Sequence, residues 1–317
     1  MIAPESDRSF VTIEPEALAE PRRRKSASAS GSVVSHPFWA NFSHESGSIL
    51  VVGHGTRNPS GVAQLLDLVG QMQIQAPAAK ITGCFLELAK PSIERAVEHL
   101  HQQGIKKTLV VPVLLFTASH ALQDIPNAVF LAARRFGIEV IGQTDSLGTH
   151  PSVLALSQTR YSEVTALDSG LCCPPMACAR VRCSSGRCEG KRISIGRIGL
   201  AMVGRGSSDP QAIAHMRRFT DKKVTQLTVV RYQTGFFACE KPTVDELLNE
   251  ASAWECNTVL VQPHLLFEGE LIELLRNRVL QCQLRFPDKQ WLISRTLGAD
   301  PKLADVFLEL AREKLEQ

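Results

Sequence analysis

"VVGHGTRNP", residues 51–59, is the most informative stretch of the chain, because the same pattern returns as "MVGRGSSDP" at residues 202–210. In both places an apolar run ends in a Gly-X-Gly turn, and a proline follows a few residues later. The apolar run is typical of a buried strand, and the two glycines allow a sharp turn with close backbone approach. The residue between the glycines is His54 in the first copy and Arg205 in the second. The turn therefore belongs to the fold, and the histidine does not.

The rest of the chain repeats at the same offset of 151 residues. "KPSI" at 90–93 matches "KPTV" at 241–244, and "LVVPVLLF" at 109–116 matches "LVQPHLLF" at 260–267. Near the end the offset becomes 150, where "SLGTHP" at 146–151 matches "TLGADP" at 296–301. Ordered matches at one offset indicate an internal duplication.

Within the first copy, apolar runs alternate with amphipathic segments. Strands are predicted near 49–53, 81–86, 108–115 and 138–142, with helices starting near 60, 91, 121 and 151. This alternation is typical of a parallel sheet covered by helices on both faces. We therefore predict an α/β protein with two tandem, doubly wound parallel-sheet domains that arose by internal duplication.

The predicted organisation has four parts. Ser, Ala, Pro and charged residues without a sustained period predict a disordered leader over 1–46. The first domain is expected over 47–167 and a Cys-rich basic linker over 168–194. A degenerate second copy is expected over 195–317.

Three polar residues follow three strands of the first copy, and none of them recurs in the second. His54, Glu87 and His120 are replaced by Arg205, Ala238 and Leu271. Because the carboxyl ends of parallel strands share one edge of a sheet, these side chains can meet around one ion. Two imidazoles and a carboxylate suit a divalent first-row metal and leave coordination positions open for chemistry.

The motifs that carry these residues resemble a known family. "GHGTRNP", "FLELAKPS" and "PVLLFTASHALQDIP" are similar to motifs of the class II metal chelatases, specifically the sirohydrochlorin chelatases of siroheme and cobalamin synthesis. The resemblance covers about 47–165 strongly and 195–317 as a degenerate copy. It implies chelatase-like domains, a cleft between the halves, and a lyase that inserts Co²⁺ or Fe²⁺ into sirohydrochlorin without ATP.

The resemblance also implies roles for single residues. It assigns metal binding and catalysis to His54 and His120, with Glu87 as the assisting acidic residue. The substrate is a tetrapyrrole that carries carboxylates, so cations beside the site are expected to bind it. The candidates are Arg57, Lys90 and, from the second copy, Arg205; a plain surface charge remains the alternative for Lys90.

Structural roles are open to the acidic residue and to some histidines. Glu87 can instead cap the helix expected near Pro91, and His150 before Pro151 reads as a helix N-cap. We expect His264, which matches Val113, to be structural. A non-catalytic metal carrier that uses the His and Cys clusters is the alternative function.

Five of the nine cysteines lie in the linker. Cys173, Cys178, Cys183 and Cys188 recur every five residues, which matches neither a zinc ribbon nor a ferredoxin. Some long chelatases of this family carry a metal-binding segment or an iron–sulfur cluster, so these thiolates are a candidate metal or iron–sulfur site. A flexible linker and a redox role are the alternatives. The other cysteines, Cys84, Cys239, Cys256 and Cys282, are expected in the core.

Composition excludes several classes of protein. With 44% hydrophobic and 21% charged residues the chain is typical of a globular protein with a real core. A net charge of +3 does not favour nucleic acid as a partner. The longest apolar run is far shorter than the roughly 20 residues of a membrane span, and the N-terminus does not read as a secretory signal. We expect a cytoplasmic monomer or homodimer with a small-molecule partner.

Overall fold

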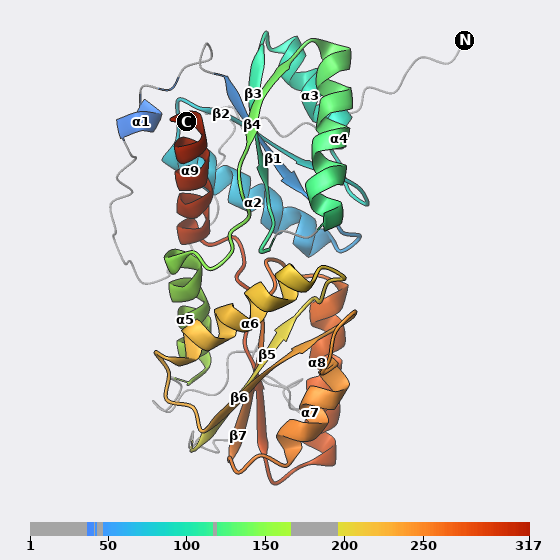
Figure 1. Cartoon of the computed structure of the whole chain (residues 1–317), viewed down its shortest axis with the longest axis vertical. Coiled ribbons are helices and arrows are strands. Elements are labelled where there is room, and N and C mark those ends of the chain that lie inside the picture. The colour runs from blue at the N-terminus through green and yellow to red at the C-terminus, as the bar shows by residue number, and fades with distance from the viewer. Residues whose placement is uncertain (1–36, 41, 43–46, 117–118, 166–195) are drawn as a thin grey trace, which may run out of the picture.

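The computed structural model describes residues 37–40, 42, 47–116, 119–165 and 196–317, with the side chains of residues 119–122 left out. The described chain forms two α/β repeats that follow each other along the long axis of the molecule (Figure 1). We call them the first repeat and the second repeat.

The first repeat is built on a sheet of four parallel strands in the order β2-β1-β3-β4. The strands are β1 (Ser48–Gly53), β2 (Lys80–Phe85), β3 (Lys107–Pro112) and β4 (Glu139–Gln143). The helices of this half of the chain are α2 (Pro59–Gln75), α3 (Ile93–Gln102), α4 (Ser119–Phe136) and α5 (Pro151–Thr165).

The second repeat has the same topology, with four parallel strands in the order β6-β5-β7-β8. The strands are β5 (Ile198–Gly204), β6 (Arg231–Phe236), β7 (Thr258–Pro263) and β8 (Gln290–Ile293). The helices are α6 (Pro210–Val224), α7 (Val244–Ser252), α8 (Glu270–Arg285) and α9 (Pro301–Leu315). The predicted fold class is confirmed.

Local sequence explains why the first helix of each repeat begins where it does. All six residues of β1 are buried, as expected for a central parallel strand covered on both faces. After the turn, Asn58 caps α2 by accepting a hydrogen bond from the Ser60 amide, and a proline takes the first helical position. Asp209 caps α6 in the same way by accepting from Gln211.

The last helix of each half packs in the other half. Helix α9 packs against α2 and against β3 and β4 of the first repeat, whereas α5 packs against α6 of the second repeat and against α9 (Figure 1). Side chains fix this exchange: the Gln75 amide donates to the carbonyl oxygen of Pro301, and that of Gln262 donates to the carbonyl oxygen of Ser157. Each sheet is therefore completed by a helix from the other half of the chain.

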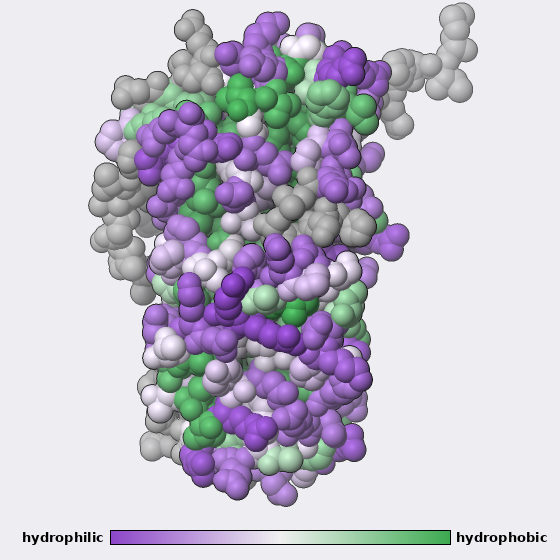
Figure 2. Space-filling model, viewed as in Figure 1, coloured by the Kyte–Doolittle hydropathy of each residue, from purple (hydrophilic) through white to green (hydrophobic). Residues whose placement is uncertain are grey.

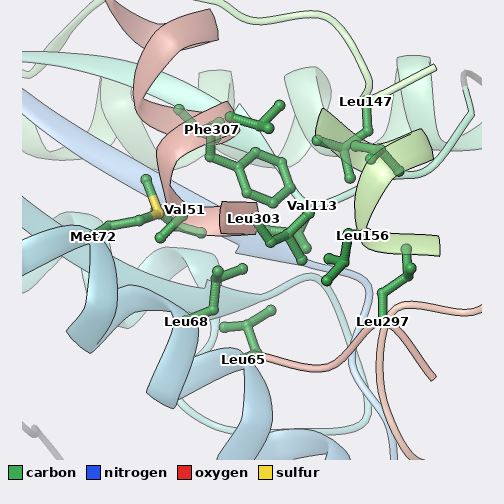
Figure 3. Close-up of a cluster of buried hydrophobic side chains, with 14 of the residues drawn as sticks. Val51, Leu65, Leu68, Met72, Val113, Leu147, Leu156, Leu297, Leu303 and Phe307 are labelled. Carbon is green, nitrogen blue, oxygen red and sulfur yellow. The ribbon is translucent and has the colours of Figure 1, made fainter. Parts of the chain in front are cut away.

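The exchanged helix α9 completes a hydrophobic core. Phe307 and Leu303 lie beside Val51, Met72 and other apolar residues of the first repeat (Figure 3). Phe307, Val51 and Met72 are fully buried. Burying a large apolar side chain stabilises a fold by about 1.5–3 kcal/mol, so α9 is a major source of stability for the first repeat.

The structure corrects three expectations. The predicted leader over 1–46 contains the short helix α1 (Pro37–Ala40), and Trp39 and Phe42 are buried in the first core. The strand predicted to reach residue 115 ends at Pro112. Cys239, predicted in the core, is exposed.

Hydrophilic residues predominate on the molecular face seen in Figure 2, with small hydrophobic areas between them. In the ranges that the structure describes, no helix combines the length and the apolar character needed to cross a bilayer.

Candidate metal and substrate site

His54 follows β1 directly, in a turn that only glycine neighbours allow. A Cβ on Gly53 would lie 2.2 Å from Cδ1 of Leu65, inside the core. A Cβ on Gly55, whose φ is +103°, would lie 1.7 Å from the carbonyl oxygen of Glu87. The first glycine thus gives α2 room, and the second brings the His54 loop against the loop that follows β2.

This close approach brings His54 and Glu87 together. Nε2 of His54 lies 3.2 Å from Oε1 of Glu87. The imidazole is 40% exposed and the carboxylate 54% exposed, so both can reach a bound ion. Their strands are neighbours in register, with Gly53 opposite Phe85. A nitrogen and an oxygen ligand on adjacent strand ends suit a divalent first-row metal.

Glu87 does not cap α3, the structural role that the sequence left open for it. Helix α3 begins at Ile93, and its N-cap is Ser92, whose hydroxyl accepts a hydrogen bond from the Arg95 amide. The Glu87 carboxylate is therefore available for another role.

His120 lies in the first turn of α4, which follows β3, the neighbour of β1 on the side away from β2. Its side chain is outside what the structure describes. Among the described side chains no group of three or more His, Cys, Asp or Glu residues is placed to hold a metal. The structure thus brings together His54 and Glu87, and it puts the His120 backbone in the first turn of the helix that follows the adjacent strand.

The three candidate cations are all exposed: Arg57, Lys90 and Arg205. Among the described residues none of them forms an ion pair. The contrast with the second repeat is informative, because Lys241, the counterpart of Lys90, pairs with Glu246 at 3.3 Å. The counterpart of Glu246 in the first repeat is Arg95, so Lys90 has no matching carboxylate.

Two of the other histidines have structural roles. Nδ1 of His150 accepts a hydrogen bond from the Ser152 amide at 3.2 Å, so the predicted N-cap is confirmed. His264 is buried, and its ring lies 4.0 Å from that of Phe219 and 5.4 Å from that of Phe116. Burial lowers the pKa of His264 to about 3, so the ring is neutral at physiological pH.

The second repeat holds the loops of the first. The side-chain amide of Asn58 donates to the carboxylate of Glu273. The backbone amide of Glu268 donates to the side-chain oxygen of Gln64 at 2.7 Å. A Cβ on Gly61 would lie only 2.4 Å from the carbonyl oxygen of Glu268. The carboxyl ends of β1 and β7 therefore face each other across the junction of the repeats.

Sequence reasoning missed Phe116 as part of this junction. Its ring lies 6.2 Å from His215, 6.4 Å from Phe219 and 5.4 Å from His264, all in the second repeat. The signal was the apolar run that continues beyond Pro112, which we assigned to the strand. The linker cysteines Cys173, Cys178, Cys183 and Cys188, proposed as a metal or iron–sulfur site, lie outside the described residues.

Comparison with known proteins extends these observations. The family model CbiX matches residues 48–164 and again residues 199–314. A sirohydrochlorin cobaltochelatase from Priestia megaterium is 25% identical over 86% of this chain and 81% of its own length. A sirohydrochlorin ferrochelatase from Bacillus subtilis strain 168 is 26% identical over 84% of this chain and 91% of its own length.

Solved structures agree on the fold. The structure of SirB from Bacillus subtilis with Fe³⁺ has a TM-score of 0.67 and 23% identity, and it covers 84% of this chain and 95% of SirB. A cobalt complex of SirB from Bacillus subtilis subspecies spizizenii has a TM-score of 0.64 and 24% identity, covering 85% and 95%. Since the family model matches both repeats in most of their length, the chain belongs to the CbiX family, a family of sirohydrochlorin chelatases.

Proposed function

We propose that this protein inserts a divalent metal ion, Co²⁺ or Fe²⁺, into sirohydrochlorin without ATP. The observation that carries the proposal is the pair of His54 and Glu87, 3.2 Å apart and half-exposed at two adjacent strand ends. The pair lies in the repeat with the intact motifs of a family whose similar members are named as sirohydrochlorin cobaltochelatases and ferrochelatases.

The proposed chemistry matches the residue types. A neutral imidazole of His54 and, in the proposal, one of His120 bind the incoming ion and replace part of its water shell. Insertion also releases two pyrrole N–H protons from the macrocycle. In the proposal Glu87 accepts a proton or completes the ligand set, and its position 3.2 Å from His54 supports this role.

Substrate binding is assigned to the cations around this pair. The carboxylates of a tetrapyrrole need charge-assisted hydrogen bonds at its perimeter. Arg57 and Lys90 are exposed beside the proposed ligands, and Arg205 occupies the position of His54 in the second repeat. The second repeat lacks all three ligands, so in this proposal it binds no catalytic metal.

The test is metal insertion by the purified full chain. Sirohydrochlorin is mixed anaerobically with Co²⁺ or Fe²⁺, without ATP, and the change in its absorption spectrum is followed against a blank without enzyme. We expect turnover above the blank, and comparison of kcat/KM for the two ions identifies the preferred metal. Tight Co²⁺ binding in calorimetry without turnover above the blank would instead support the metal carrier.

A further inference from the structure

Leu88 occupies a backbone conformation that leucine rarely takes. Its φ is +62°, in the left-handed region where Cβ crowds the backbone. The Ala89 amide donates to the carbonyl oxygen of Glu87 at 2.7 Å, which closes a three-residue γ-turn around Leu88. This form of γ-turn, with a positive φ at its centre, is rare and strained.

The turn is locked to the loop that carries His54. The Leu86 amide donates to the carbonyl oxygen of Gly53 at 2.9 Å, and the Glu87 amide donates to that of His54 at 3.0 Å. Leu88 is therefore held one residue away from the proposed metal ligand Glu87.

Folding does not account for a leucine at this position. Leu88 is 50% exposed, whereas its neighbours Leu86 and Ala89 pack against the hydrophobic cores of the first repeat. Within the described residues Leu88 belongs to none of these cores. Glycine would relieve the strain, and a polar side chain would suit the exposure. Strain that persists beside a functional site points to a role in function.

The second repeat has the same backbone conformation at this position without the leucine side chain. Its counterpart Cys239 has a φ of +63° and is also exposed. There the Ala238 amide donates to the carbonyl oxygen of Arg205, and a Cβ on Gly206 would lie 1.9 Å from the carbonyl oxygen of Ala238. The positive φ is thus common to both repeats, while the large apolar side chain occurs in the repeat that has the His–Glu pair.

We propose that Leu88 is a substrate-binding residue that packs against the face of the tetrapyrrole beside the metal site. This inference rests on the proposed function. A tetrapyrrole is a flat conjugated ring with its carboxylates at the perimeter. Cationic side chains can bind these carboxylates, whereas the face of the ring requires an apolar contact. Binding buries the exposed half of Leu88, which the hydrophobic effect favours.

The decisive variant is Leu88→Gly, which removes the side chain and the strain together. We expect the thermal midpoint to stay the same or rise, because glycine accepts a positive φ. We expect the KM for sirohydrochlorin to rise about tenfold, while kcat and the affinity for Co²⁺ stay unchanged. Leu88→Met keeps an apolar contact and should retain a KM close to that of the wild type. Cys239→Gly, the matched control, relieves the same strain in the second repeat and should leave KM unchanged.

Binding without metal distinguishes this inference from the proposed function. The affinity of the wild type and of Leu88→Gly for sirohydrochlorin is measured from the ligand's own fluorescence. Binding about tenfold weaker in the variant supports the contact, even if insertion itself were absent and the proposed function had failed. Equal affinities would overturn the contact while leaving insertion by the wild type intact. A lower thermal midpoint with a parallel loss of kcat would also overturn it, because Leu88 would then be structural.

Discussion

Lys223 donates a hydrogen bond to the carbonyl oxygen of Ser157 at 2.8 Å inside the core, where the first repeat places Met72 near Phe307. The match follows from the offsets of the duplication, 151 residues for Lys223 and 150 for Ser157. Figure 3 shows the apolar version of this contact, with Met72 and Phe307 in one cluster. In the second repeat the position of Met72 is taken by Lys223, which is fully buried.

The amine of Lys223 makes stability depend on pH above neutrality. Burial lowers the pKa of Lys223 from 10.5 to about 7. Between pH 7 and 10.5 the unfolded chain binds a proton that the folded chain does not, so stability rises with pH there and is lowest below pH 7. The slope is about 1.4 kcal/mol per pH unit. We expect Lys223→Met to stabilise the protein at pH 7 and to remove this slope, as measured by urea unfolding from pH 6 to 10. An unchanged slope would show that Lys223 stays charged in the fold.

His264 makes a separate prediction on the acid side. Its pKa falls from 6.5 to about 3, first through burial and then through the charge of Lys223. The unfolded chain binds the extra proton between these values, so this contribution to stability is lost as the pH falls from 6.5 towards 3. We expect His264→Val, which installs the residue of the first repeat, to be less sensitive to acid than the wild type. The measurement is the free energy of unfolding at pH 4.5 relative to pH 7, and equal differences in both proteins would contradict it.

Replacing each proposed ligand by its counterpart from the second repeat tests the proposed metal site. The variants His54→Arg, Glu87→Ala and His120→Leu each install the residue with which the second repeat folds. We expect the fold to persist and the insertion rate to fall by at least about 100-fold for either histidine, since even outer-sphere partners of a metal are worth 10–100-fold. Circular dichroism checks the fold and spectral turnover the activity. Near-normal turnover in either histidine variant would remove that residue from the site.

Lys90 and Lys241 form a matched pair for testing substrate charge. We expect Lys90→Glu to raise the KM for sirohydrochlorin about fivefold or more, with an effect that weakens at high salt. Lys241→Glu changes the same charge at a lysine already paired with Glu246 and should leave KM nearly unchanged. Steady-state kinetics at two salt concentrations measures both. Equal effects of the two variants would mean that net charge, and not position, is what matters.

Phe116 tests whether the second repeat positions the segment that carries the proposed ligand His120. It lies four residues before His120 and packs against three rings of the second repeat. Its counterpart Phe267 also packs in the core but precedes Leu271, which is no ligand. We expect Phe116→Ala to slow insertion about 10- to 100-fold, because displaced catalytic groups cost this much. Phe267→Ala should slow it far less at a similar loss of stability. Activity losses in proportion to the thermal midpoints of the two variants would show that Phe116 acts only through stability.

The sequence predicted most of the sheet because glycine and proline bound its apolar runs. β1 was expected at 49–53 and spans Ser48–Gly53, and β4 was expected at 138–142 and spans Glu139–Gln143. The error at β3 has a physical cause. Leu114 packs against a core of the first repeat, and Phe116 packs against rings of the second repeat, although neither residue is in the strand. Hydrophobicity reports burial and does not tell a strand from a buried loop.

The sequence predicts that His54 and Glu87 lie together because both follow strand ends, and the structure brings them together. Other features leave no local signal. In contrast, Lys223 reads as an ordinary basic residue in the last turn of a helix, where cations are favourable. Leu88 carries no mark of a positive φ, because no glycine stands there. The exchange of α5 and α9 depends on which sheet each helix meets, and the sequence of a helix does not name the sheet that it covers.

Because α9 completes the core of the first repeat, this repeat cannot finish folding until the end of the chain has been synthesised. Helix α9 is made about 150 residues after α5, which at about 5–20 residues per second is a delay of roughly 8–30 s. During that interval the four strands of the first repeat can already assemble into their sheet. However, Val51 and Met72 are not yet covered by Phe307, which packs with them in the finished core. The repeat that carries the proposed metal ligands is thus synthesised first and completed last.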